Sequence, residues 1–439
     1  MSGKLLDLLQ PLWGERPCLF MDGEQWSYAE LLAEAGILRA QWGLMRSQRV
    51  ALDGLSARSL IPALLALDGE VEALLLLPAN ADSSLCDILM AQASCTHRLS
   101  EHGLYDLVQH TVDTSWVGAT RWLLATSGTT GTPKLIEHTL RSLSRSCRCD
   151  SRRGAEYVWG LLYDPARFAG LQVLLQALLA GSALVLLDGL PISRQVELLL
   201  QGRVNALSAT PSLWRRLLMD ERSTQLPLRQ VTLGGEIADA VILQVLRSRY
   251  PQARLVHIYA STEAGVGFAV QDGLPGFPVR WLATGEAGID LRVRNDGHLL
   301  IRPRLPVGGG EIARRTDAEG YLDTGDLVLL QGDRVLFLGR DSGVINVGGN
   351  KVSPEQIESF LRLIPGVIDA RVSGRHSSMM GQLVAAELVI APDRERSALR
   401  REILQQCRAG LERWQVPALL DFVDTLPETP AGKRERIRE

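Results

Sequence analysis

The chain has too little positive charge to suggest that it binds nucleic acid. Its 439 residues carry 47 Lys and Arg against 50 Asp and Glu, which gives a net charge of −3. We therefore expect no nucleic-acid partner. The first ten residues include an acid, Asp7, and have no long apolar core, so they lack the pattern of a signal peptide.

Cysteine is sparse and scattered along the chain. Cys147 and Cys149 stand closer together than the usual paired zinc ligands, and no Cys/His cluster completes a metal site. We therefore expect reduced thiols in a cytoplasmic protein. The six positions are Cys18, Cys86, Cys95, Cys147, Cys149 and Cys407.

Long apolar runs are rare as well. Residues 168–187 form a stretch of twenty residues without a charge, which is long enough to span a membrane. Gln172 and Gln176 fall within it, and Gly181 interrupts it. We interpret it as a buried helix that ends at Ala180, a break at glycine, and a strand over 183–187, so no membrane span is expected. The chain also has no internal repeat and no low-complexity tract.

Short apolar runs alternate with helical patterns up to about residue 300. Residues 50–53 and 73–78 are predicted to be buried parallel strands, and residues 59–67 the helix between them. Near the start, Ser27 and Glu30 have the spacing of a capping box. The pattern predicts the α/β class, with a large N-terminal domain of parallel-rich sheets and helices.

The pattern changes after Gly297. Close-set strands with Gly/Asp turns, over 298–301, 321–322 and 334–338, predict a small antiparallel or barrel-like β subdomain. A compact α+β unit is predicted beyond Asp341, with helices over 353–363 and 394–409 and strands over 368–373 and 383–390. We thus predict an N-terminal domain over 1–338, a hinge over 339–342 and a small mobile C-terminal domain over 343–439.

A hydroxyl- and glycine-rich loop follows the apolar segment 122–125. It runs from Thr126 to Lys134, with Ser127, Gly128, Thr129 and Thr130 between them. Glycines let backbone N–H groups approach an anion, and the hydroxyls and the lysine add donors and charge. The loop is not a Walker A motif, because Pro133 precedes the lysine and Leu135 follows it. Alone, it is equally consistent with a flexible turn.

Four further segments decide between these interpretations. Residues 259–263 resemble a Tyr-Gly-x-Thr-Glu motif, with Ala260 in place of the glycine. Residues 321–327 resemble Tyr-x-x-Thr-Gly-Asp-Leu, residues 339–358 resemble a hinge segment, and residues 427–433 resemble Pro-x-Thr-x-x-Gly-Lys. Together and in this order, the five segments resemble the adenylate-forming ligases: the acyl- and aryl-CoA synthetases and the adenylation domains of peptide synthetases. The resemblance runs from about residue 120 to the end and, more faintly, covers the start.

The resemblance implies a site for ATP. Its loop would hold the β- and γ-phosphates, Tyr259 would stack on adenine, and Asp326 would accept hydrogen bonds from the ribose hydroxyls. Thr262 would bind the α-phosphate, and Glu263 would ligate Mg²⁺ through a hard oxygen. The implied ATP- and AMP-binding residues are Thr126, Ser127, Gly128, Thr129, Thr130, Lys134, Gly235, Tyr259, Asp326 and Arg340.

The resemblance also assigns catalytic and hinge residues. Lys433, with Thr262 and Glu263 the predicted catalytic group, would bridge the acyl carboxylate and the α-phosphate. It would swing out for the thioester step as the C-terminal domain rotates about Asp341. The loop of that second step matches at Gly349 and Lys351, but Asn346 stands where many members have lysine.

The acyl pocket is implied by the segment 167–171. It falls where aryl- and acyl-CoA ligases often carry His-x-x-Gly-Leu, which makes an α-amino acid substrate less favoured. The predicted pocket residues are Arg167, Phe168, Gly170, Gly234 and Gly265. Four arginines, Arg141, Arg145, Arg148 and Arg152, repeat near helical spacing; they form either a solvated face or a dock for CoA phosphates or a carrier protein.

The leading interpretation is therefore an AMP-forming ligase. It would use ATP and Mg²⁺ to activate a small aryl or acyl carboxylic acid, then pass it to CoA or to the phosphopantetheine of an acyl carrier protein. Compared with the family, the segment before the phosphate loop is short, and this condensed N-terminal half, together with Asn346, favours a carrier protein as the acceptor. The alternative from another class is a non-catalytic nucleotide- or acyl-binding relative that acts as a regulator or scaffold.

Overall fold

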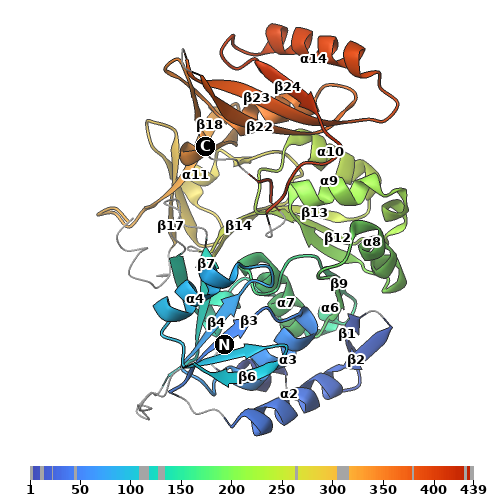
Figure 1. The fold of residues 1–439 in the computed structure, drawn as a ribbon, viewed down its shortest axis with the longest axis vertical. Helices are drawn as coiled ribbons and strands as arrows, with labels where there is room; N and C mark the ends of the chain where they lie inside the picture. Colours follow the sequence, from blue (N-terminus) through green and yellow to red (C-terminus); the bar gives the residue numbers. More distant parts are fainter. Residues whose placement is uncertain are drawn as a thin grey trace.

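The computed structural model describes residues 3–9, 14–21, 23–43, 47–107, 118–126, 134–262, 265–303, 316–377, 380–429 and 433–435. It shows a large N-terminal part built on two sheets, a β subdomain beside them, and a small C-terminal domain at one end of the molecule, next to α9 and α10 (Figure 1). The predicted α/β class with a small C-terminal domain is confirmed.

The first sheet is parallel at its centre and antiparallel at both edges. In the described part of the chain it has six strands, and Val50 pairs in parallel with Leu74, as predicted. In spatial order the strands are β6 (Gly103–Asp106), β5 (His97–Ser100), β3 (Arg49–Asp53), β4 (Ala73–Leu77), β7 (Arg121–Thr126) and β8 (Lys134–Thr139).

The second sheet has the same plan. Its eight strands among the described residues pair in parallel except at the two ends, where β2 and β14 run antiparallel. In spatial order they are β14 (Gly265–Val270), β13 (Arg254–Ser261), β12 (Gln230–Gly234), β11 (Ala206–Ala209), β9 (Val158–Leu161), β10 (Ala183–Leu186), β1 (Pro17–Met21) and β2 (Glu24–Ser27).

Helices cover these sheets, and two of them follow the sequence closely. Ser27 caps α2 and forms the predicted capping box with Glu30. The uncharged stretch is the buried helix α7, which ends at Ala180 before a left-handed Gly181 and the strand β10. Within the described residues, no helix is long and apolar enough to cross a membrane. The helices are α1 (Leu5–Leu9), α2 (Tyr28–Trp42), α3 (Ala57–Leu67), α4 (Ser83–Gln92), α5 (Leu140–Leu143), α6 (Ser151–Gly154), α7 (Phe168–Ala180), α8 (Ile192–Gln201), α9 (Pro211–Met219), η1 (Glu221–Gln225), α10 (Ala240–Arg249) and α11 (Trp281–Thr284).

The first helix is bound to the core by a buried carboxylate. Asp68 accepts hydrogen bonds from the backbone N–H of Leu5 at 2.7 Å and from the indole N–H of Trp122 at 2.9 Å. Leu5 and Leu9 are fully buried in the cluster that also holds the apolar faces of α3 and α7. The start of the chain is therefore part of the main core.

The β subdomain begins earlier than predicted. An antiparallel sheet already includes β15 (Phe277–Pro278) and β16 (Ile289–Val293), upstream of Gly297. These strands are short and have no long apolar run, so the sequence pattern does not reveal them. The other strands are β17 (His298–Pro303), β18 (Leu322–Gln331) and β19 (Arg334–Arg340), followed by the turn η2 (Asp341–Gly343).

The C-terminal domain packs two helices on a mainly antiparallel sheet, in which β24 pairs in parallel with β23, around its own apolar core. The segment 344–352, which sequence analysis treated as a loop, is a β-hairpin. The four arginines from 141 to 152 do not share one helix face either, because α5 and α6 are separate short helices. The C-terminal elements are β20 (Ile345–Val347), β21 (Asn350–Val352), α13 (Pro354–Arg362), β22 (Val367–Ser377), β23 (Gly381–Ile390), α14 (Arg396–Gly410) and β24 (Leu419–Phe422).

Candidate active site

Three parallel strands of the larger sheet end at the same edge and bring predicted site residues together. Ala209 of β11 pairs with Leu233 of β12, and Gly234 pairs with Ile258 of β13. The carboxyl ends of parallel strands are the usual place for ligands in such sheets. Gly234, Gly235 and Thr262 therefore lie at or just beyond one edge of one sheet.

Asp326 connects three of the predicted ATP-binding residues. Its Oδ2 accepts a hydrogen bond from the Tyr259 hydroxyl at 2.5 Å, and its Oδ1 accepts one from Arg340 Nε at 3.1 Å. Asp326 and Arg340 are cross-strand partners on β18 and β19. The Arg340 side chain is 58% exposed and that of Asp326 is 13% exposed, so a ligand can reach the pair from the solvent side.

The ring of Tyr259 already has aromatic neighbours. It stacks nearly parallel to Phe268, with centroids 5.1 Å apart, and to Phe337, with centroids 5.2 Å apart. Burial, and then the charge of Asp326, raise the pKa of Tyr259 well above its usual value, so the hydroxyl stays a donor. Stacking of Tyr259 on adenine remains a prediction.

Lys433 reaches the edge formed by β12. A Cβ built on Gly235 would lie 2.9 Å from Cε and 3.7 Å from Nζ of this lysine, and Gly235 has a φ of +81°. A side chain at position 235 would therefore meet both backbone strain and the lysine stem. The loop that carries Lys433 closes on itself, because Thr429 N–H donates to the Lys433 carbonyl at 2.7 Å. The predicted catalytic lysine therefore lies beside Gly235, a predicted ATP-binding residue.

His138 was missed by the sequence analysis. This buried residue of β8 hydrogen-bonds through Nε2 to the carbonyl of Thr262 at 2.8 Å. Its ring lies 5.8 Å from that of Phe168, a predicted pocket residue. His138 therefore joins the strand after the predicted phosphate loop to two other predicted regions. A lone histidine in an apolar strand gives no signal of this kind in the sequence.

The ends of the predicted phosphate loop are held as a strand pair. Thr126 of β7 and Lys134 of β8 are register partners in an antiparallel ladder. The loop thus joins two strands, whereas a Walker A loop leads into a helix. Five predicted site residues lie outside the described part of the chain: Ser127, Gly128, Thr129, Thr130 and Glu263.

The other predicted pocket residues have structural contacts. Arg167 Nε lies 3.7 Å from Asp164 Oδ2, and burial lowers the pKa of the arginine. A Cβ on Gly170 would lie 2.2 Å from the Asp164 carbonyl oxygen, so a close backbone approach requires this glycine. Gly265 has a φ of +74° and open space around it. Their roles in substrate binding remain predictions.

The hinge region carries an exposed ion pair. Lys351 Nζ lies 3.7 Å from Asp341 Oδ1, with side chains 78% and 46% exposed. Asn346, the residue that departs from the family pattern, accepts a hydrogen bond from Gly349 N–H at 2.9 Å and so closes the β20–β21 turn. A lysine side chain has no acceptor and could not make this hydrogen bond.

Comparison with known proteins identifies the family. A model described as AMP-binding enzyme matches residues 82–321, and one described as AMP-binding enzyme C-terminal domain matches residues 356–433. The chain belongs to the AMP-binding enzymes. It is an ATP-dependent, AMP-forming acid–thiol ligase, as the five motifs indicated.

Individual relatives of this AMP-binding enzyme are distant. The chain is similar to 2-succinylbenzoate–CoA ligase of Listeria monocytogenes, with 26% identity over 72% of this chain and 68% of the relative. It is equally similar, at 26% identity over 76% and 68%, to enterobactin synthase component E of Escherichia coli. The anthranilate CoA ligase AuaEII, solved with anthranoyl-AMP, shares the fold with a TM-score of 0.78, 16% identity and coverage of 98% and 95%.

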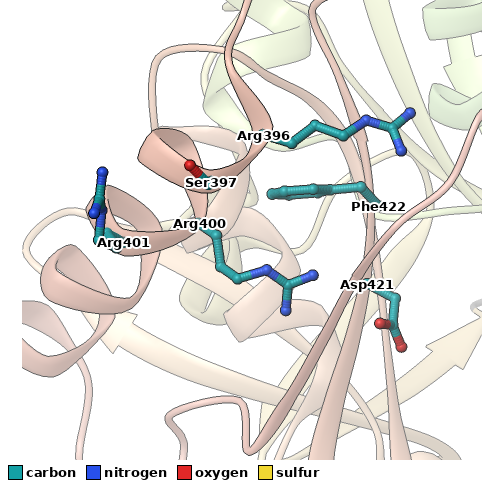
Figure 2. Close-up of a pocket in the computed structure, with 6 residues that line it drawn as sticks. All are labelled: Arg396, Ser397, Arg400, Arg401, Asp421 and Phe422. Carbon is teal, nitrogen blue, oxygen red and sulfur yellow. The ribbon is translucent and has the colours of Figure 1, made fainter.

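A surface hollow of this AMP-binding enzyme lies apart from the motifs. Figure 2 shows it on the C-terminal domain, between α14 and β24, with arginine side chains around Phe422. None of the predicted site residues is among those that line it: Arg396, Ser397, Arg400, Arg401, Asp421 and Phe422.

Proposed function

We propose that the enzyme activates an aryl carboxylic acid and transfers its acyl group to CoA. Two of the similar proteins are named for aryl acids, 2-succinylbenzoate and anthranilate, and both names include CoA as the acceptor. The observation that carries the adenylation step is the Lys433 stem over Gly235, at the end of the strand next to the one that carries Tyr259. A cation at this point can stabilise charge on both the carboxylate and the α-phosphate.

The proposed chemistry has two balanced steps. A carboxylate oxygen of the acid attacks the α-phosphorus of ATP, and pyrophosphate leaves with the bridging oxygen. The sulfur of the thiol then attacks the acyl carbon, AMP leaves, and the thiol proton passes to solvent. Asp326 and Arg340 would hold the ribose, while Thr262 would bind the α-phosphate in the first step.

The remaining site assignments belong to the same proposal. Ser127, Gly128, Thr129, Thr130, Thr126 and Lys134 would hold the leaving pyrophosphate, and Glu263 would ligate Mg²⁺. Rotation of a C-terminal domain over 343–439 about Asp341 would withdraw Lys433 and bring in Gly349 and Lys351. A cytoplasmic location stays part of this proposal.

A carrier protein is the second candidate acceptor. Asn346 supports it, because its side chain closes a turn at a position where many relatives have lysine. Another similar protein is named as a component of the enterobactin synthase. Thioester formation from the same aryl-adenylate, measured with CoA and with holo carrier proteins, distinguishes the two acceptors.

The experiment that tests the function is acid-dependent exchange of labelled pyrophosphate into ATP. A panel of aryl, fatty and amino acids would be assayed, and exchange with one or more aryl acids is expected. ATP binding without exchange for any acid would instead support the non-catalytic alternative. An exchange-positive acid would then be tested for thioester formation with CoA and with holo carrier proteins.

A further inference from the structure

Arg434, the residue after the catalytic lysine, is buried between two domains. Its side chain is 5% exposed and forms an ion pair with Asp369 of the C-terminal domain. Its backbone N–H donates to Glu236 Oε1 of the large domain at 2.5 Å. One residue is thus anchored on both sides of the interface, next to Lys433.

The anchor on the large domain is itself fixed. Glu236 follows Gly235, the residue beneath the Lys433 stem. Its carboxylate also accepts hydrogen bonds from Ser212 N–H at 2.9 Å and from Ser212 Oγ at 3.1 Å. Ser212 lies in the first turn of α9, where the helix dipole favours a negative charge.

The anchor on the C-terminal domain is fixed as well. Asp369 at the start of β22 accepts a hydrogen bond from Arg362 Nε at 3.0 Å and one from Ala370 N–H at 2.8 Å. Arg362 in turn lies 3.2 Å from Asp239 of the large domain. The carboxylate that holds Arg434 therefore cannot shift without disturbing a buried set of charges.

We propose that Arg434, held by Glu236 and Asp369, is a positioning residue that sets the Lys433 ammonium in place for adenylation. A free lysine side chain has many rotamers, and fixing the adjacent backbone restricts where its stem can lie. Lys433 is an exposed residue, and fixing the main chain beside it does not bury its side chain. This inference rests on the proposed adenylation function, and it predicts an effect on that half-reaction alone.

The test compares Arg434→Met with Arg434→Lys, which keeps a charge for Asp369. We expect Arg434→Met to lower kcat of pyrophosphate exchange by about 10²-fold, since a misplacement of about 1 Å can cost that much. The KM for ATP and thioester formation from supplied aryl-adenylate should stay as in the wild type. Arg434→Lys should recover most of the lost rate. Arg396→Met, on the same domain but in the surface hollow, is the matched control and should behave as the wild type.

A second measurement does not depend on activity. Hydrogen exchange of the segment 428–435 should speed up in Arg434→Met and in Glu236→Ala, while the two sheets of the large domain exchange as in the wild type. The inference would be overturned if Arg434→Met exchanged pyrophosphate at the wild-type rate or lost both half-reactions equally. It would also be overturned if the amide hydrogen exchange of the segment stayed as in the wild type. Wild-type protein without pyrophosphate exchange would refute the proposed function instead, and the hydrogen-exchange result would still decide whether Arg434 holds this segment.

Discussion

The C-terminal domain meets the rest of the chain through two sets of ion pairs that differ in burial. At the interface with α9 and α10, Arg215 pairs with Asp239 at 2.5 Å, and Arg362 lies 3.2 Å from the same Asp239. These side chains are 7–8% exposed. At the predicted hinge, the side chains of Lys351 and Asp341 are 78% and 46% exposed. A buried charge needs its partner far more than an exposed one does.

The positive and negative charges of the buried set are equal in number within each domain. Arg215 and Asp239 belong to the large domain, with one positive and one negative charge. Arg362, Arg434, Glu358 and Asp369 belong to the C-terminal domain, with two of each sign. Each of these two groups is therefore neutral and internally paired. The difference teaches that the charges buried at this interface are paired within each domain as well as across it.

The largest effect is expected from a change at Lys433, which lies beside Gly235 in this orientation of the C-terminal domain. Lys433→Ala should lower acid-dependent pyrophosphate exchange by about 10²–10³-fold, the usual loss when one transition-state charge contact is removed. Thioester formation from a supplied aryl-adenylate should be largely spared. Comparable loss of both steps would show that the lysine does not act in adenylation alone.

The next effect tests burial itself. Asp239→Asn keeps the helix cap of α10, which accepts from Ile242 N–H at 3.0 Å, but removes the charge between Arg215 and Arg362. We expect a loss of about 3–5 kcal/mol in the free energy of unfolding, measured with urea. Asp296→Asn, in the exposed pair with Arg294, is the control. A loss no larger than in that control would mean that solvent reaches the interface charges.

A smaller effect is expected at the hinge. Lys351→Met removes the exposed pair with Asp341 and should change the free energy of unfolding by only about 0–1 kcal/mol. Melting temperature, compared with that of the wild type at low and high salt, checks this. A large loss would show that the hinge pair, and not the buried interface, holds the domains together.

As the pH falls, the stability contributed by the buried His257 should be lost before that of the interface ion pairs. Burial lowers the pKa of His257 below 6.5, so the unfolded chain binds more protons in the window between the two values. Stability is complete above pH 6.5 and is lost as pH falls through that window. His257→Asn should flatten this slope in urea unfolding at pH 5–8. A slope that persists in full would assign it to other groups.

The ion-pair interface should persist to lower pH. Burial alone would raise the pKa of Asp369, but Arg362, Arg215 and Arg434 outweigh it and lower the pKa. Its contribution is therefore present above the unfolded value of about 3.9 and is lost only as pH falls through the lowered folded value.

Local patterns were predictable from the sequence, and long-range contacts were not. The Ser27 capping box and the helix–glycine–strand order around Gly181 depend on neighbouring residues, and both were found. The order of five motifs gave the family. The hairpin at 344–352 was missed, because two three-residue strands carry no clear period.

The contacts around Lys433 show the same limit. Glu236 and Asp369 lie 198 and 65 positions from Arg434. Nothing in the local pattern of either residue marks it as a partner of the C-terminal loop. Similarly, His138 and Thr262 are 124 positions apart. Motifs in the sequence indicate which residues carry the chemistry. The distant residues that hold them in place are found only in the folded structure.

The burial of the first helix has a consequence for how the protein is made. Leu5 and Leu9 pack into the cluster that contains α3 and α7, and the Asp68 carboxylate joins Leu5 to Trp122. About 180 residues must therefore leave the ribosome before the first helix has its complete binding surface. A tag fused to the N-terminus needs a linker long enough to let α1 dock, whereas a tag too close to it would leave Leu5 and Leu9 exposed during synthesis.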